Sequence, residues 1–147
     1  MVDTTAIGRT FAPYTTDVDP ERLRFFAKAI GETRPEYVDD AAARAAGHPS
    51  LPAPPTYTVV LSMDQPAPFS WLREIGIDIA RVLHGAQAFR YFAPIHAGDR
   101  LTFASRVANV MQKKSGSRAF VVKITDITNQ HGTLVAEMRT TVVVRGS

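Results

Sequence analysis

Near the middle of the chain stands an apolar octapeptide, Thr56-Tyr57-Thr58-Val59-Val60-Leu61-Ser62-Met63. Its periodicity fits a buried helix as well as a buried strand, so the residues around it must decide. The Pro55-Thr56 pair in front of it is typical of a helix start, and the segment is short for a pair of core strands. We therefore predict a buried helix here, which other elements must cover.

Downstream of this helix the pattern changes at His84 to apolar residues at every second position, as in half-buried strands. One strand is predicted around Phe89 and Tyr91 and extends toward Ile95, where Pro94 and the turn Ala97-Gly98-Asp99 break it. Three more follow at 101–111, 119–124 and 134–144, with Ser115-Gly116-Ser117 and Asn129-Gln130-His131-Gly132 as turns. On the first of these three, one face is predicted to hold Leu101, Phe103, Ser105, Val107, Asn109 and Met111.

Upstream of the octapeptide the chain is built of short helices and loops. A helix is predicted from Pro20 to Gly31, because Asp19 is a good N-cap and glycine a natural stop. A second covers 41–46, capped by Asp39 or Asp40. The segment 7–16 fits a first strand or an extended lead-in. Four prolines between 48 and 56 forbid regular structure in that loop. The whole pattern is an α+β fold in which an antiparallel sheet wraps a central helix, and the open sheet edge favours a dimer.

Length and composition set further limits. The chain has 147 residues, 17 Lys+Arg and 14 Asp+Glu, four His and no Cys. This length predicts one domain, 1–147. The absence of cysteine excludes disulfides and thiolate chemistry and, with no signal peptide in view, indicates the cytoplasm. We expect no membrane span, no metal site and no cofactor. The net charge of +3 is spread along the chain, which argues against nucleic-acid binding and suits a phosphate-bearing small ligand.

The stretch with the character of a functional site is Ala29-Ile30-Gly31-Glu32-Thr33-Arg34-Pro35-Glu36-Tyr37-Val38-Asp39-Asp40. Further motifs follow it in order: Ala53-Pro54-Pro55-Thr56, Val82-Leu83-His84-Gly85-Ala86-Gln87 and Ala97-Gly98-Asp99-Arg100-Leu101. Each motif is weak, but their shared order over nearly the whole chain is specific. In this order the sequence resembles the MaoC-like (R)-specific enoyl-thioester hydratases and dehydratases. The resemblance implies a hot-dog fold, an acyl-CoA or acyl-carrier-protein thioester as ligand, and a hydro-lyase (enoyl-CoA hydratase or dehydratase) activity of fatty acid metabolism.

Two departures from that family concern the catalytic groups. Competent members carry Gly-Asp-x-Asn-Pro-x-His-x-Asp, in which the Asp and His handle the water, whereas this chain has Glu32 and Tyr37 at those places. Tyrosine, with an ordinary pKa near 10, is a poor general base at neutral pH. Competent members also have a His-Gly pair whose N–H helps to bind the thioester oxygen. Here Pro54-Pro55 takes its place, and proline has no N–H to donate.

The same features resemble the non-catalytic, N-terminal half of dehydratases built from two hot dogs. They imply a subunit that supplies the acyl and pantetheine tunnel to a catalytic hot-dog partner, with Val59 beside the acyl chain. The expected substrate-binding residues are Pro54, Pro55, Thr56, Tyr57, Val60 and Met63.

Two alternatives stay open at this stage. One is an autonomous homodimeric acyl-CoA hydratase or thioesterase that uses Glu32, Tyr37 or His84. The other is a non-catalytic acyl-thioester-binding protein. Whether the chain alone is an enzyme is therefore undecided. For His84, a buried, hydrogen-bonded structural role at a strand start is favoured over a catalytic one. His48 is expected to be a solvated loop residue and His96 a turn residue.

Overall fold

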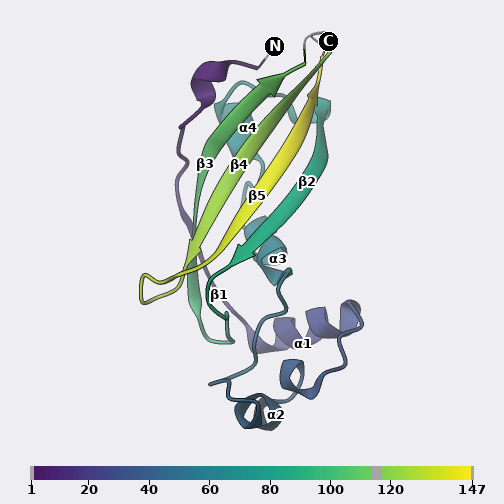
Figure 1. Cartoon of the computed structure of the whole chain (residues 1–147), viewed down its shortest axis with the longest axis vertical. Helices are drawn as coiled ribbons and strands as arrows, with labels where there is room; N and C mark the ends of the chain where they lie inside the picture. The colour runs from purple at the N-terminus through teal and green to yellow at the C-terminus, as the bar shows by residue number, and fades with distance from the viewer. Residues whose placement is uncertain (1, 114–116, 147) are drawn as a thin grey trace.

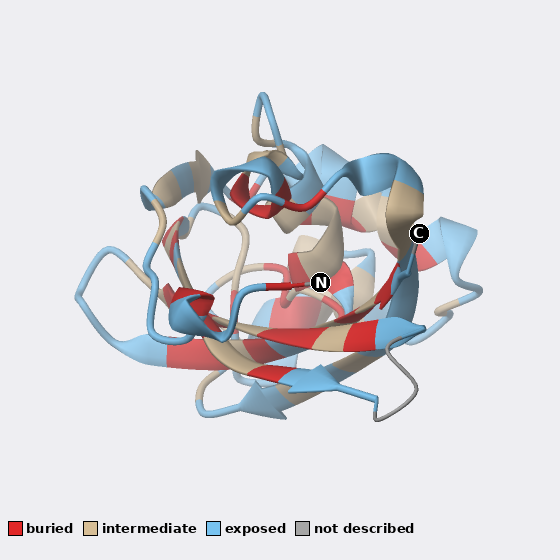
Figure 2. Ribbon diagram, turned by 90° about the horizontal axis from the view of Figure 1, so that it is seen from above, coloured by how far each residue is buried: buried red, intermediate tan, exposed pale blue. Residues whose placement is uncertain are grey.

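The computed structural model describes residues 2–113 and 117–146, so that Ser115 and Gly116 of the predicted hairpin tip lie outside the described residues. Five strands form an antiparallel sheet in the order β1-β3-β4-β5-β2, which curls around helix α3 (Figures 1 and 2). The strands are β1 (Tyr14–Asp17), β2 (Val82–Tyr91), β3 (Arg100–Gln112), β4 (Arg118–Thr128) and β5 (Leu134–Arg145). The α+β class predicted from the sequence is confirmed.

The helices are short. They are α1 (Pro20–Ala29), α2 (Asp40–Ala45), α3 (Tyr57–Met63) and α4 (Ser70–Glu74), with 3₁₀ turns η1 (Thr4–Ala6), η2 (Pro35–Tyr37) and η3 (Ile79–Arg81). The octapeptide is helical from Tyr57 onward, as predicted. In the described part of the chain no helix has both the length and the apolar character that a membrane crossing requires.

Local chemistry explains where the first two helices begin. The Asp19 carboxylate accepts a hydrogen bond of 2.8 Å from the Arg22 N–H and so caps α1, with Pro20 in its first turn. Asp39 caps α2 in the same way through the Ala42 N–H, at 2.7 Å. After α1 the backbone turns at Gly31, whose φ of +71° a side chain would resist. The sequence predicted Asp19 as the cap of α1 and left that of α2 between Asp39 and Asp40; the structure assigns it to Asp39.

Two strand predictions need correction. Strand β2 begins at Val82 and ends at Tyr91, so Ile95 is not part of it; Ile95 lies in a loop, and its carbonyl accepts from the Ala53 N–H at 2.8 Å. On β3 the predicted face does not run through to Met111. A bulge between Val107 and Asn109 shifts the alternation, which buries Val110 and leaves Met111 exposed.

The buried residues gather at two levels of the sheet. The lower cluster surrounds α1 and α3, at the bottom of Figure 1, and includes Leu23, Tyr57, Leu61, Phe103 and Ile127. The upper cluster surrounds α4 and includes Trp71, Leu72, Val110, Val121 and Val142. Between them, half-buried Lys123 and Thr140 lie on the concave face of the sheet, and a cavity opens there.

Candidate functional site

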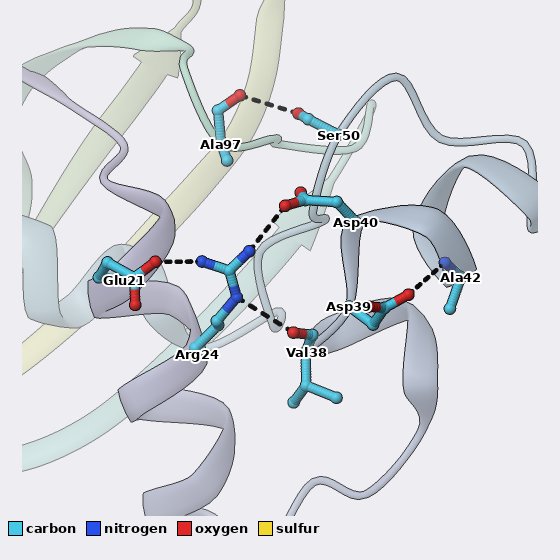
Figure 3. A network of polar contacts seen from close by, with 8 residues as sticks. All are labelled: Glu21, Arg24, Val38, Asp39, Asp40, Ala42, Ser50 and Ala97. Carbon is cyan, nitrogen blue, oxygen red and sulfur yellow. Dashed lines mark hydrogen bonds and ion pairs between the residues drawn. The ribbon is translucent and has the colours of Figure 1, made fainter.

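The segment that follows α1 is held in place by Arg24. Its guanidinium donates to the Val38 carbonyl at 3.1 Å and to the Asp40 carboxylate at 2.7 Å, and it also pairs with Glu21 (Figure 3). These contacts tie α1 to the start of α2. The predicted site residues Glu32 and Tyr37 lie within the segment fixed in this way.

Glu32 is engaged by its own neighbour. Arg34 donates to the two carboxylate oxygens from Nε at 3.1 Å and from Nη2 at 2.8 Å, and its backbone N–H adds a bond of 3.0 Å. These hydrogen bonds lower the pKa of Glu32 to about 2, so that the side chain is a firmly ionised carboxylate. A carboxylate with so low a pKa is a weak base at neutral pH.

Tyr37 lies on the other side of the same arginine. The Arg34 guanidinium carbon stands 4.7 Å from the centre of the Tyr37 ring, a cation–π contact. Glu32, Arg34 and Tyr37 thus form one cluster, in which the residues at the positions of the family's acid and base are both bound to an arginine.

The structure brings Tyr37 together with Pro54 and Pro55 in an outer cleft of about 460 Å³, which also involves His48 and the segment 91–95. The Tyr91 hydroxyl donates to the Pro55 carbonyl at 2.9 Å. Glu32 does not line this cleft. Thr56 lies exposed just before α3, and its side chain makes no capping bond.

The remaining predicted residues lie deeper. Val59, Met63 and His84 line an inner cavity of about 390 Å³ between α3, α4 and the sheet, on the concave face. Tyr57 is buried in the lower cluster, 5.2 Å from the Phe26 ring, and the half-buried Val60 packs against the same cluster. The sequence-predicted residues are therefore divided between two hollows and the core.

Sequence reasoning missed the polar side chains of the inner cavity, above all Lys123 and Thr140. Lys123 is packed over the Trp71 ring at 4.8 Å, and burial lowers its pKa to about 8. The available signal was its position on β4: Val121, Lys123, Thr125 and Ile127 alternate, so a lysine stands at an inward-facing position.

Histidines 48 and 96 also differ from expectation. Their rings face each other, with His48 Nδ1 3.1 Å from His96 Nε2, and both side chains are half-buried. His48 is therefore not simply a solvated loop residue. Among the residues that the structure describes, no three His, Asp or Glu side chains are grouped so as to hold a metal ion.

Most of the chain, including the Glu32–Arg34–Tyr37 cluster and the outer cleft, falls within a match to a known protein family. Residues 5–138 match the family described as "FAS1-like, dehydratase domain region". The chain belongs to this family. Its structural neighbours include MaoC-like dehydratases, so this FAS1-like dehydratase-region protein has the hot-dog fold that the resemblance implied.

Individual relatives support the assignment. A UPF0336 protein of Streptomyces griseus is 40% identical over 99% of this FAS1-like chain and 97% of its own length. The HadBC complex of Mycobacterium tuberculosis, a 3R-hydroxyacyl-ACP dehydratase, contains a chain with a TM-score of 0.82 and 26% identity, matched over 94% of this chain and 96% of that one. The ChsH1-ChsH2 complex of the same organism contains a chain with a TM-score of 0.75 and 25% identity, over 92% and 88%.

Proposed function

We propose that this chain is the tunnel-forming subunit of an (R)-specific enoyl-thioester hydratase or 3-hydroxyacyl-thioester dehydratase, and that a second hot-dog chain supplies the catalytic pair. Adding water to an enoyl thioester needs a base that takes a proton from the water as its oxygen attacks the β-carbon. It also needs an acid that protonates the α-carbon, and donors for the thioester oxygen. In the proposed pair, the partner carries the base and the acid.

One observation carries the proposal: the Glu32 carboxylate is held by Arg34. A base for water should be free to accept a proton and should have a pKa close to the working pH. Glu32 has a pKa of about 2 and already accepts three hydrogen bonds. Tyr37, its counterpart, is stacked on the same guanidinium.

The loop before α3 also supports the proposal that the catalytic groups come from the partner chain. Donors to a thioester oxygen are usually backbone N–H groups, and neither Pro54 nor Pro55 has one. This chain does offer a thioester two hollows: an outer cleft at the prolines before α3, and an inner cavity beside Val59 and Met63 of α3. The proposed ligand is an acyl thioester of CoA or of acyl carrier protein; that the protein works in the cytoplasm stays a prediction from the sequence.

Partnership is supported by the free edge of β2 and by the neighbours. Strand β2 pairs only with β5 in the described structure, and Leu83 and Phe92, on and just after it, are exposed. The two structural neighbours from Mycobacterium tuberculosis, in HadBC and ChsH1-ChsH2, are chains of two-component complexes. For this chain we propose a heterodimer with a catalytic hot-dog subunit.

The test is hydration of crotonyl-CoA, followed by loss of absorbance of the enoyl thioester. We expect the purified chain to show no turnover alone and to be active when co-purified with a chain that carries Gly-Asp-x-Asn-Pro-x-His. Robust turnover by the chain alone would contradict the proposal and would show that the chain is an autonomous enzyme. In that event Glu32→Gln and His84→Ala identify the group responsible, since only the catalytic one abolishes the rate.

A further inference from the structure

The inner cavity contains a polar band in a place where the sheet could have continued its apolar core. Gln87, Thr140 and Lys123 are direct cross-strand neighbours on β2, β5 and β4. Along β4, Val121 of the upper cluster lies above this row; below it come Thr125, whose hydroxyl is 2.8 Å from that of Ser105, and then Ile127 of the lower cluster. A fold that needed only stability would fill this position with aliphatic side chains.

Lys123 stands out within the band because no counter-charge satisfies it. Its ammonium group lies over the Trp71 ring, and in the described part of the chain no carboxylate forms an ion pair with it. A second, smaller hollow of about 290 Å³ shares Lys123 with the inner cavity and is lined by Glu74, but that carboxylate pairs with Arg9 at 3.8 Å. Burying a cation without a partner is unfavourable, and an anion that reaches it offsets that cost.

Three of the other polar side chains of the cavity, Thr140, Ser62 and Gln65, use a donor within the chain, whereas the His84 imidazole, which also lines it, is a further donor for a ligand. The Thr140 hydroxyl donates to Gln87 Oε1 at 2.9 Å, and the Ser62 hydroxyl donates to the Val59 carbonyl at 2.7 Å. The Gln65 amide donates to the Ser62 carbonyl at 2.8 Å. Of the described residues that line the cavity, Lys123 alone is a lysine or arginine, and its ammonium calls for an acceptor, best a charged one.

The rest of the wall is apolar. Val59, Met63, Leu72, Met138 and Val142 surround the polar band, and the volume of about 390 Å³ lies within the usual range of small-molecule sites, roughly 300–1,000 Å³. A methylene chain fits these side chains, and a single anionic group at its end fits Lys123.

We propose that the acyl group bound by this subunit carries a carboxylate, and that Lys123 is the residue that selects it. This specificity rests on the proposed function for the thioester part of the ligand, whereas the carboxylate subsite is a property of this chain alone. The substrate class is then a monothioester of a dicarboxylic acid rather than a plain fatty acyl thioester.

Ligand binding to the inner cavity can be followed by the intrinsic tryptophan fluorescence of the chain. Trp71 is its one tryptophan and lines the inner cavity under Lys123, so a ligand at the subsite changes the tryptophan fluorescence directly. The full-length chain is titrated with hexanoyl-pantetheine, with adipoyl-pantetheine and with free hexanoate. The two thioesters differ in the terminal carboxylate, and free hexanoate presents a carboxylate without a thioester.

We expect adipoyl-pantetheine to bind about tenfold more tightly than hexanoyl-pantetheine, the usual effect of one charge-assisted hydrogen bond. Lys123→Met should abolish this preference and Lys123→Arg should retain it. Lys28→Met removes the same charge from the exposed face of α1 and should leave the preference intact. Circular dichroism establishes that each variant is folded, and the arginine variant keeps the test valid if the methionine variant is not.

The outcomes separate the two proposals. Thioester binding with no preference for the carboxylate, or a preference that survives in Lys123→Met, overturns the specificity and leaves the tunnel role standing. Hexanoate binding that depends on Lys123 supports the subsite whether or not the chain binds a thioester without its partner. Absence of binding by all three ligands overturns the subsite, whereas the tunnel role is tested by the hydration assay with the partner present.

Discussion

At the scale of single residues, the cluster of Glu32, Arg34 and Tyr37 decides how the site is interpreted. The sequence predicted that Glu32 and Tyr37 replace the family's catalytic pair, but it could not show that Arg34 binds both of them. That contact depends on the turn Pro35–Tyr37, which returns the tyrosine ring to the guanidinium. A catalytic role for Glu32 or Tyr37 stays a prediction from the sequence.

The state of Glu32 can be measured. We expect its carboxyl carbon to titrate by NMR with a pKa of about 2, and Arg34→Ala to move that pKa up toward the ordinary 4.5, because the hydrogen bonds that favour the charged form are lost. Since the folded-state pKa is depressed, the ion pair stabilises the fold above about pH 4.5, and its contribution disappears as the pH falls toward 2. Arg44→Ala, on the exposed surface of α2, is the matched control. An unchanged pKa in Arg34→Ala would mean that another group holds the carboxylate.

At the scale of elements, sequence signals worked where they were local. Asp19, Pro20 and Asp39 specify their helix starts through bonds that span at most three residues. The errors at Ile95 and Met111 have a different origin. The loop at Ile95 is fixed by Ala53, far away in the sequence, and the phase of β3 is changed by a bulge that only its pairing with β4 defines. Lys123 was missed for a similar reason, since its surroundings come from α3, α4 and β5.

The irregular part of β2 provides a prediction at this scale. Gly85 lies where the pairing of β2 with β5 shifts register, and a Cβ there would meet the Thr141 carbonyl oxygen at 3.1 Å and a Val143 methyl at 3.0 Å. A backbone oxygen cannot move aside as a flexible side chain can. Gly85→Ala should therefore lower the free energy of unfolding by about 1–3 kcal/mol, measured by urea denaturation. Ala88→Ser, three residues along the same strand and exposed, should change it by less than about 0.5 kcal/mol. Equal stability of wild type and Gly85→Ala would show that the bulge adjusts without cost.

At the scale of the whole molecule, the exposed edge of β2 lies beside both the inner cavity and the outer cleft. The inner cavity, the outer cleft and the edge of β2 lie on neighbouring parts of the structure, because Val82, His84 and Tyr91 of this strand line one hollow or the other. A partner that pairs with the edge of β2 would therefore also form the far wall of the tunnel.

The edge of β2 can be tested by charge. Leu83 is 53% exposed on this strand, and Leu83→Asp would place a carboxylate in the apolar part of any interface that uses it. Light scattering should then find the variant at about the 16.1 kDa of one chain, and the catalytic partner should no longer co-purify with it, while circular dichroism remains that of the wild type. Ile7→Asp is the control, because Ile7 is 47% exposed but follows η1, which contacts β3 on the opposite side of the sheet order. If Leu83→Asp still assembles as the wild type does, β2 is not the joint between subunits, and the tunnel must be closed by another face of the molecule.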